Sequence, residues 1–311
     1  MKKITQRNLL ANNKYWLDLE LRKDIDDYLT LIYCLEKGVG LQAISINNPS
    51  MNELLLLNST LRRFKSNAPI VISGSITEYK NDADGNEDIH ESLLYLIDGE
   101  SKEDLAGVKY MGTDAPTLGG ATVFCGGSLS TLNELIRITH NDTTINACVQ
   151  GGYAGPLLVT AENTLRKFKK RKSVPTWNLN LDIEASMSVL EATNVNCVFV
   201  SKDICHDSWI SESDIVGGTS FFSKVLKDYF DSIDWSDKKC LHDVLAFMTL
   251  TTPNLVSFES VHLKNNYEPK VENKGYIKWW SEPREDDEVF PMISTSFNKE
   301  LFISTVKDIC M

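Results

Sequence analysis

The most constraining feature of this chain is an acidic cluster that runs directly into an apolar helical pattern. Five acidic side chains fall within ten residues, and the segment DLELRKDIDDYLTLIYCLE (Asp18–Glu36) then continues with mainly apolar residues. Carboxylates held close together in a folded core repel one another and are costly to keep charged. A hard cation such as Ca²⁺, which takes oxygen ligands, or a polyol substrate would satisfy them. The alternative is a solvated helix start, because Asp and Glu favour the first helical turn.

The residues on either side of the cluster favour a binding site. Apolar residues before it predict a strand and those after it predict a helix, so the acids lie at a strand-to-helix switch. Open α/β sheets bind their ligands at such positions.

Strand-length apolar runs alternate with helical patterns along the rest of the chain. This alternation predicts an α/β fold with a doubly wound, mostly parallel sheet flanked by helices. The predicted strands are 15–19, 41–46, 69–73, 121–125, 145–149 and 196–201, and the predicted helices are 25–37, 52–65, 131–139, 183–192, 220–229, 241–249 and 299–309. No repeat or linker divides the sequence, so we expect a single domain over residues 1–311, with an irregular stretch at 265–291.

The composition is typical of a water-soluble enzyme. No apolar run approaches the ~18 residues that a membrane-spanning helix needs, and the mean hydropathy is -0.20. The net charge of -11 argues against nucleic acid as a partner. The seven cysteines contain no CxxC pair, and the amino terminus lacks the apolar core of a signal peptide. We therefore expect reduced thiols in a cytoplasmic protein that binds no membrane.

Two polar segments follow predicted strands, at the sheet edge where ligands bind. SINNPS contains Asn47 and Asn48, whose amides suit hydroxyl recognition, although Asn-Asn-Pro is also a good turn. CGGSLSTLNEL begins at Cys125, and its glycines allow either a close backbone approach to a ligand or a tight turn that opens a helix.

Two later segments also carry candidate site residues. In VPTWNLNLD, Asn178, Asn180 and Asp182 alternate with apolar residues and should share one face of an extended segment. In LHDVLAF, His242 and Asp243 open an apolar helix and place an acid beside a carboxylate. The alternative for Asp243 is a helix N-cap.

Two familiar signals fail on inspection. NDADGNED (81–88) resembles a calcium loop, but a loop that begins at Asp82 places Glu87 at the glycine position and Leu93 at the final glutamate position. No Gly-x-Ser-x-Gly elbow supports Ser-His-Asp catalysis. The basic run RKFKKRK (166–172) is interpreted as a solvated loop in preference to a ligand-binding one.

In chain order, these segments resemble a divergent branch of the inosine–uridine nucleoside hydrolase family. That family opens with Asp-x-Asp-Pro-Gly-x-Asp-Asp, and the branch carries the longer form Asp-Thr-Asp/Glu-Ile-Gly-x-Asp-Ile-Asp-Asp, to which DLELRKDIDDYLTL is similar without a gap. The later segments AISINN, APIVISGS, TVFCGGSLSTLNEL, VQGGYAGP, TWNLNLDIEA, LHDVLAF and FNKELFISTVKDI resemble family segments in the same order. The resemblance covers nearly the whole chain and implies a nucleoside-hydrolase-like fold.

The resemblance also implies an activity, which is Ca²⁺-dependent hydrolysis of the N-glycosidic bond of a ribonucleoside, as in purine and pyrimidine salvage. Asp26 would be the general base that activates a metal-bound water, and His242 the acid near the departing base. The implied metal ligands are Glu20, Asp27, Asp243 and a backbone carbonyl of Gly126 or Cys125. The implied substrate-binding residues are Asn47, Asn48, Asn178, Thr176, Asp26 and Asp243. Asp18 and Asp24 would stand behind these residues and brace them.

Departures from the family pattern concern the substrate more than the fold. Glu20 replaces the usual Asp, Arg22 and Lys23 replace small residues, and Thr176 replaces a Glu that holds the ribose 5′-hydroxyl. No Pro follows Asp243. A 5′-phosphorylated N-riboside is therefore an alternative substrate, and a catalytically silent binding protein is an alternative function. The family also implies a homo-oligomer, either a dimer or a tetramer, with a nucleoside or nucleotide as its small-molecule partner.

Overall fold

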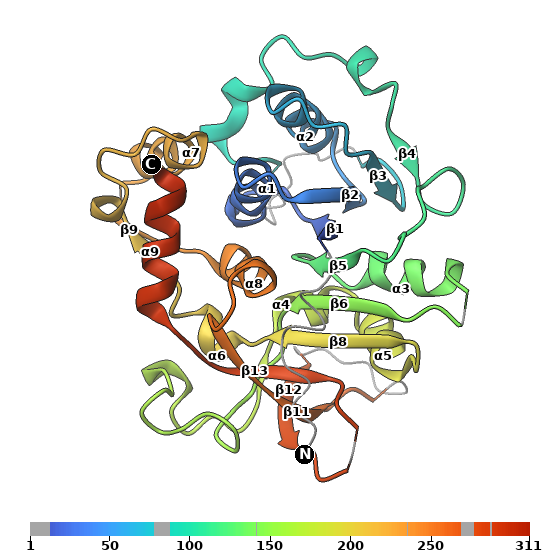
Figure 1. The fold of residues 1–311 in the computed structure, drawn as a ribbon, viewed down its shortest axis with the longest axis vertical. Helices are drawn as coiled ribbons and strands as arrows, with labels where there is room; N and C mark the ends of the chain where they lie inside the picture. The colour runs from blue at the N-terminus through green and yellow to red at the C-terminus, as the bar shows by residue number, and fades with distance from the viewer. Residues whose placement is uncertain (1–12, 78–87, 141, 235, 269–276, 287) are drawn as a thin grey trace.

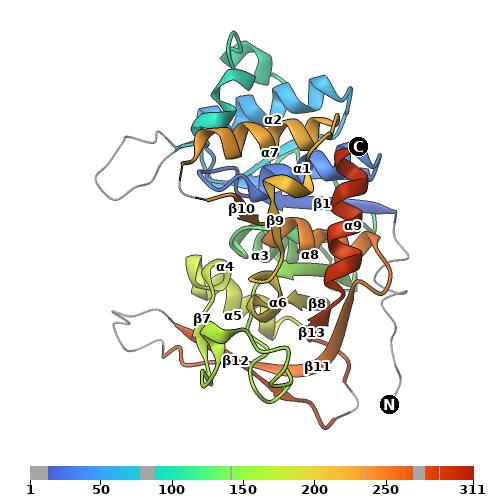
Figure 2. The same ribbon diagram turned by 90° about the vertical axis from the view of Figure 1, so that its left-hand side faces the viewer.

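One long, mostly parallel sheet runs through the molecule, with helices on both of its faces (Figures 1 and 2). The structure is a computed structural model that describes residues 13–77, 88–140, 142–234, 236–268, 277–286 and 288–311. Its strands are β1 (Lys14–Leu19), β2 (Gly40–Asn47), β3 (Ile70–Ser73), β4 (Lys109–Tyr110), β5 (Thr122–Cys125), β6 (Ile145–Gln150), β7 (Val174–Pro175), β8 (Val195–Val200), β9 (Trp209–Ser211), β10 (Lys238–Cys240), β11 (Val256–Asn265), β12 (Lys278–Pro283) and β13 (Met292–Phe297).

The strand order identifies the point where the chain reverses its winding. Within the described residues the main sheet has 11 strands in the order β4-β3-β2-β1-β5-β6-β8-β13-β11-β12-β7, and β9 pairs with β10 separately. Neighbours from β4 to β13 are parallel, whereas β11, β12 and β7 add an antiparallel edge. Because β1 lies between β2 and β5, the crossovers leave it in opposite directions, and sheets of this kind bind ligands at that switch point.

The helices divide between the two faces of the sheet. They are α1 (Asp26–Glu36), α2 (Met51–Arg63), α3 (Ser130–Ile138), α4 (Trp177–Leu181), α5 (Ile183–Glu191), α6 (Lys202–Cys205), α7 (Phe221–Ser232), α8 (His242–Thr251) and α9 (Lys299–Cys310). One core cluster contains apolar residues of α1, α2, α7, α8 and α9, and a second contains those of α3 and α5. Each face of the sheet therefore has its own core.

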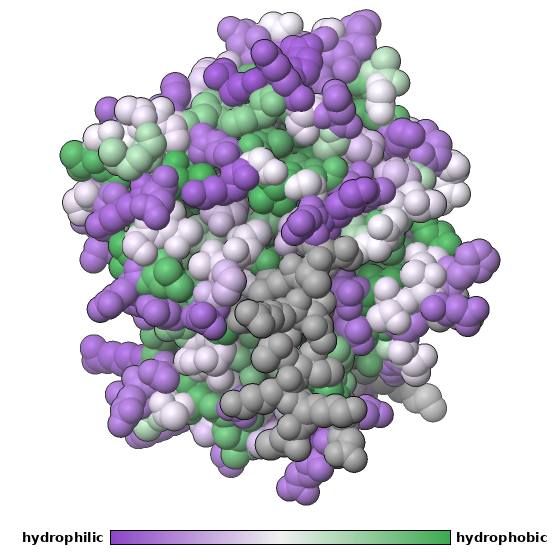
Figure 3. Space-filling view, viewed as in Figure 1, coloured by the Kyte–Doolittle hydropathy of each residue, from purple (hydrophilic) through white to green (hydrophobic). Residues whose placement is uncertain are grey.

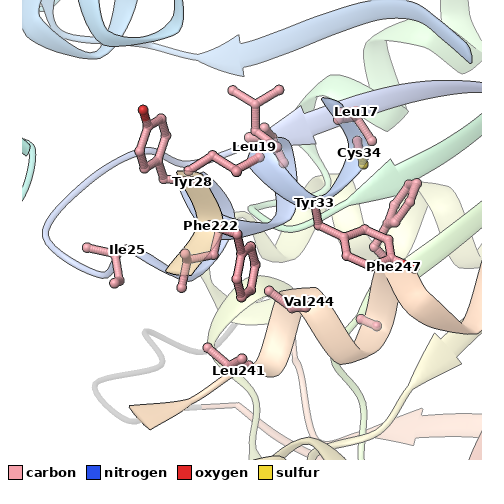
Figure 4. Packing of buried hydrophobic residues seen from close by; sticks show 14 of the residues in the cluster. Leu17, Leu19, Ile25, Tyr28, Tyr33, Cys34, Phe222, Leu241, Val244 and Phe247 are labelled. Atoms are coloured by element: carbon pink, nitrogen blue, oxygen red, sulfur yellow. The ribbon is translucent and has the colours of Figure 1, made fainter. Parts of the chain in front are cut away.

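Packing between α1 and α8 positions the candidate site. Leu17 of β1 and Phe247 of α8 are both fully buried in the first cluster, and burying such a side chain stabilises a fold by about 1.5–3 kcal/mol. The Phe247 ring packs edge-on against Tyr15 and Tyr33, with centroids 5.3 Å and 6.1 Å apart. Figure 4 shows Tyr33 and Phe247 beside each other at this contact. The contact holds the middle of α8 against the second half of α1.

The predicted doubly wound α/β fold is confirmed, whereas two local predictions are wrong. Residues 265–291 are not irregular throughout, because β12 pairs there with β11 and β7. The expected extended segment at 174–182 turns into α4 after β7, so its polar side chains do not share a face. Asn180 instead accepts from Trp279 Nε1 at 2.7 Å and donates to a backbone carbonyl, and Asp182 caps α5 by accepting from Ala185 N at 2.9 Å. Local alternation of polar and apolar residues therefore did not fix the backbone conformation.

The surface of the described chain is largely polar. Figure 3 shows hydrophilic side chains over much of the face seen in Figure 1, in keeping with a charged content of 24%. Of the helices in the described ranges, none is both long and apolar enough to cross a membrane. The acidic loop expected at 81–88 lies outside the described residues except for Asp88, which accepts from Ser50 Oγ at 2.6 Å.

Candidate functional site

The candidate site lies where β1 and β5 end side by side in the sheet (Figure 1). The acidic segment follows β1, and the glycine turn follows Cys125, the last residue of β5. The Gly126 amide donates to the carbonyl oxygen of Asp18 at 2.8 Å, which holds the turn against the end of β1. Residues that are distant in the sequence therefore meet at the switch point of the sheet.

Three buried carboxylates come together at this point from α1 and α8. Asp26 and Asp27 open α1, and Asp243 is the second residue of α8. The Asp243 amide donates to Asp26 Oδ2 at 3.0 Å across a separation of 217 residues. The structure therefore brings these three predicted site residues together, and their shared role stays a prediction.

Gly126 marks where two of these carboxylates approach the backbone. A Cβ atom at this position would lie 2.0 Å from Asp27 Oδ1 and 3.4 Å from Asp243 Oδ1. At the next residue, Gly127, a Cβ would have its nearest neighbour, the Cβ of Glu20, at 3.4 Å. The two acids thus lie over Gly126, in space that only a glycine leaves open.

Burial disfavours the charged form of all three acids. It raises the pKa of Asp26 to about 6, and together with repulsion from neighbouring carboxylates it raises the pKa of Asp27 and of Asp243 well above the ordinary range. One oxygen of each, the Oδ1 atom, is buried without a hydrogen-bond partner among the described residues. Buried carboxylate oxygens left unpaired in this way favour a bound cation or a proton.

The donor set fits a hard cation at Asp27 and Asp243, whose unpaired oxygens are the ligand type that Ca²⁺ prefers. Glu20 is engaged by another residue, because its Oε1 pairs with Arg22 Nη1 at 2.8 Å. In the part of the chain that the structure describes, no three His, Cys, Asp or Glu side chains form a ready metal site. The predicted set of Glu20, Asp27 and Asp243 is therefore not assembled here, since carboxylates without a cation repel and Arg22 attracts Glu20.

Lys239 is a site residue that the sequence analysis missed. Its ammonium lies 2.6 Å from Asp24 Oδ1, which also accepts from the Asp26 amide at 3.2 Å. Burial opposes the charge on Lys239, but Asp26 and Asp24 raise its pKa overall. Burial likewise opposes ionisation of Asp24, yet the nearby ammonium lowers the pKa of that carboxyl. The available signal was the lysine pair 238–239, which lies one residue before the LHD segment.

His242, the first residue of α8, lies beside Asp26 with its Nδ1 3.8 Å from Asp26 Oδ2. Burial and then the charge of Lys239 lower the pKa of His242 to about 4, so the neutral imidazole prevails near neutral pH. The ring of His206, which the sequence analysis also missed, lies 4.8 Å from that of His242. A neutral ring at this position can donate a hydrogen bond but does not hold a spare proton.

Asp18 lies behind the acids at the end of β1. It is buried, and its Oδ1 accepts from Ser45 Oγ at 2.7 Å, while Ser45 Oγ accepts from Trp16 Nε1 at 2.8 Å. Burial raises the pKa of Asp18 to about 7. This chain of hydrogen bonds ties the acidic segment to β2, as expected for a bracing residue.

The two asparagines after β2 are engaged in turn contacts. Asn48 adopts a left-handed φ of 46°, which Asn tolerates, and its Oδ1 accepts from the Ser75 amide at 3.0 Å. Its Nδ2 donates to Asn47 Oδ1 at 3.3 Å, and Asn47 Nδ2 donates to Ser128 Oγ at 3.4 Å. The structure thus places both residues near the site but commits their amides to neighbouring loops.

The segment around α4 contributes buried polar groups from the other side of the switch point. Asn178 Nδ2 donates to the Gly126 carbonyl at 2.6 Å and to Gln150 Oε1 at 2.7 Å. Thr176 is 2% exposed, and its hydroxyl has no partner among the described residues. Trp177 between them is 62% exposed and was not singled out from the sequence.

Comparisons with known proteins agree with the predicted fold. No family model matches the sequence, and no curated protein sequence matches it. Among solved structures, the chain is similar to a plant nucleoside hydrolase, the PpNRh1 enzyme, with a TM-score of 0.60, 16% identity, and coverage of 96% of this chain and 98% of that one. An inosine-guanosine nucleoside hydrolase gives a TM-score of 0.62 and 13% identity, with coverage of 96% of this chain and 98% of that one. The effector protein XOO4466 gives a TM-score of 0.57 and 11% identity, with coverage of 98% of this chain and 97% of that one. The chain therefore has the nucleoside hydrolase fold, and its assignment to the inosine–uridine branch stays a prediction.

Proposed function

We propose that this protein is a Ca²⁺-dependent N-ribosyl hydrolase that releases the base and ribose from a ribonucleoside. The supporting observation is the group of three buried acids, Asp26, Asp27 and Asp243, each with one unpaired carboxylate oxygen. They lie at the switch point of a sheet with the fold of nucleoside hydrolases. Buried acids in a switch-point site are candidates for chemistry, because an unneeded carboxylate would not be kept there at such cost.

Asp27, Asp243, Glu20 and a carbonyl of Gly126 or Cys125 would hold the Ca²⁺, which supplies a positive charge that orients water and lowers its pKa. Arg22 would have to give up Glu20 for the full set to form, because it holds that carboxylate at 2.8 Å. The Gly126 carbonyl accepts from Asn178 Nδ2 and has a second lone pair available.

Asp26 would take a proton from the attacking water. The Asp243 amide fixes its Oδ2 at 3.0 Å, and its Oδ1 has no partner among the described residues. A carboxyl group with a pKa of about 6 is ionised near neutral pH. Because its pKa is close to neutral pH, it can also accept a proton during the reaction. As the water oxygen bonds to the anomeric carbon, the bond from that carbon to the base nitrogen breaks and its electron pair leaves with the base.

His242 would assist departure of the base by donating a hydrogen bond from its neutral ring. Its Nε2 is buried without a partner among the described residues. Asn48, Asn178 and Thr176 would contact the sugar, and the two asparagines would exchange their present partners for ribose hydroxyls. In keeping with the family resemblance, we further propose a cytoplasmic homo-oligomer, a dimer or tetramer, that acts in nucleoside salvage.

One observation favours a second candidate, a catalytically silent binding protein. The Glu20–Arg22 ion pair neutralises one predicted ligand with a residue of the chain itself. A protein that no longer uses a metal would keep such a pair.

A reducing-sugar assay over a panel of nucleosides and their 5′-monophosphates, with added Ca²⁺ or a chelator, separates the candidates. Calcium-dependent release of ribose supports the hydrolase. Binding of nucleosides without release of sugar from any panel member would support the silent protein instead. Light scattering on the same preparation tests the oligomeric state.

A further inference from the structure

Lys239 is a buried lysine beside the acidic centre, and it takes no part in the steps proposed above. It is the middle residue of β10, where it pairs with Ile210 of β9, and its side chain is only 8% exposed. Its neighbour Lys238 is exposed. Lysines are seldom buried, because a shielded ammonium group is costly unless opposite charges surround it. The charged end of Lys239 is therefore held by the carboxylates next to it.

Lys239 holds a carboxylate that lies just before α1. Its Nζ is 2.6 Å from Asp24 Oδ1 and 5.9 Å from the centroid of the Tyr229 ring. The Asp24 side chain keeps 63% of its surface exposed, so the ammonium is the shielded member of the pair. A charge-assisted hydrogen bond to a shielded partner gives this carboxylate one preferred position.

Asp24 passes this constraint to the backbone of Asp26. The same oxygen, Asp24 Oδ1, accepts from the Asp26 amide at 3.2 Å. Asp26 is the first residue of α1, and the residue at the cap position of this helix is the apolar Ile25. The first amides of a helix need acceptors from outside it, and the Asp24 carboxylate supplies one.

The segment 239–243 contacts Asp26 at two further points. The Asp243 amide donates to Asp26 Oδ2 at 3.0 Å, and His242 Nδ1 lies 3.8 Å from the same oxygen. Leu241 anchors the segment in the core, where it is fully buried (Figure 4). One short segment therefore acts on the carboxylate of Asp26 directly and on its backbone through Asp24.

We propose that Lys239 is a positioning residue for Asp26. By holding Asp24, its ammonium fixes the start of α1 and with it the orientation of the Asp26 carboxylate. The inference rests on the proposed function, in which Asp26 acts as the base. A displacement of about 1 Å can cost about 10²-fold in rate, so loss of the ammonium should lower kcat. A lysine with a merely structural role would change stability and leave the kcat of the folded enzyme as it is.

Kinetics on the full-length protein saturated with Ca²⁺ test this role. Lys239→Met and Lys239→Arg are compared with Lys238→Met, a matched control because Lys238 is an exposed lysine of the same strand. The pH is one at which kcat no longer changes with pH, so that altered protonation does not contribute. We expect Lys239→Met to lower kcat about ten- to a hundredfold and to change KM by less than about twofold. Lys239→Arg should recover most of the loss, and Lys238→Met should match the wild type.

Hydrogen exchange at the Asp26 amide gives a second readout that needs no activity. Because this amide donates to Asp24, it should exchange about tenfold or more faster in Lys239→Met than in the wild type or Lys238→Met. Asp24→Asn should show the same two effects, since it keeps an oxygen for the amide but loses the ion pair. The variant that combines both substitutions should be no slower than the slower single one, because both break one contact. If Lys239→Met does not give a native circular dichroism spectrum, Asp24→Asn replaces it.

Two results would overturn the proposal. One is equal protection of the Asp26 amide in Lys239→Met and Lys238→Met. The other is a kcat of Lys239→Met that equals that of Lys238→Met, or that Lys239→Arg does not raise. A wild type that releases no base from any nucleoside or nucleotide would refute the proposed function instead. The exchange measurement would then decide by itself whether Lys239 holds Asp26.

Discussion

Substituting alanine for Gly126 should damage the acidic centre while leaving the fold intact. Neither Gly126 nor Gly127 has a left-handed φ, so alanine is compatible with the backbone at both positions. At Gly126 the new methyl group would lie 2.0 Å from Asp27 Oδ1, well inside the separation of 3.0 Å that real Cβ contacts respect. The Asp27 carboxylate would therefore have to move by about 1 Å or more, which can cost about 10²-fold in a site that depends on orientation.

The expected size of the effect follows from binding linkage. A ligand at a hundred times its dissociation constant stabilises a protein by about 2.7 kcal/mol, and a 10²-fold weaker site at the same concentration gives only about 0.4 kcal/mol. We therefore expect Ca²⁺ to raise the free energy of unfolding of the wild type clearly and that of Gly126→Ala very little. Overpacking at the substituted site should also lower the stability of the metal-free protein by about 1–3 kcal/mol.

Denaturant unfolding with Ca²⁺ and with chelator measures both quantities. Gly127→Ala is the matched control, because its methyl group would meet atoms of Glu20 at ordinary contact distances, the nearest being the Cβ at 3.4 Å. The control should keep the calcium-dependent stabilisation of the wild type. If Gly126→Ala is stabilised by Ca²⁺ as strongly as Gly127→Ala, the argument that Asp27 binds the metal over Gly126 is wrong.

Two further substitutions test the site, and a third tests Asp203, a buried acid of α6 that accepts from the Ala154 amide at 2.7 Å. Arg22→Met should release Glu20 and so raise the Ca²⁺ affinity measured by calorimetry several-fold. Lys23→Met is its control, because it removes one charge but keeps the Glu20–Arg22 ion pair. Equal affinities in the two variants would contradict a competition between Arg22 and Ca²⁺ for Glu20. Burial raises the pKa of Asp203 to about 6, so this carboxyl binds a proton more tightly in the folded state than in the unfolded state. The free energy of unfolding therefore falls as the pH rises from about 4 to about 6. Asp203→Asn should remove about 3 kcal/mol of that fall in denaturant unfolding, and an unchanged slope would show that Asp203 does not titrate in this range. His242→Ala should slow release of poor leaving bases more than good ones, and an equal loss of kcat across purine and pyrimidine nucleosides would remove its role at the leaving group.

The alternation of strands and helices and the location of the acidic segment could be predicted because both follow from local patterns. Buried parallel strands produce continuous apolar runs, and the acidic segment directly follows one of them. The meeting of Asp26 with Asp243 is less predictable, because α8 follows β10, which pairs with β9 outside the main sheet.

The errors arose where short-range patterns are ambiguous or contacts are long-range. Alternating polar residues in 177–181 mimic a strand, and five residues are too few for a helical period to show. The contact between the rings of His206 and His242 joins segments that are distant in sequence, so no local spacing signals it. The burial of Lys239 likewise depends on Asp24, which lies 215 residues away.

The central claim is that Asp26 acts beside a bound cation to cleave an N-glycosidic bond. Its most direct test measures base release from the best nucleoside or nucleotide substrate by the wild type and by Asp26→Asn, each with Ca²⁺ and with chelator. The amide preserves the shape of the side chain and can still accept from the Asp243 amide, but it is not a base near neutral pH. We expect rapid release only by the calcium-loaded wild type, with the Asp26→Asn rate lower by about 10²–10⁴-fold. Equal rates for the two proteins with Ca²⁺, or full activity of the wild type in chelator, would contradict it.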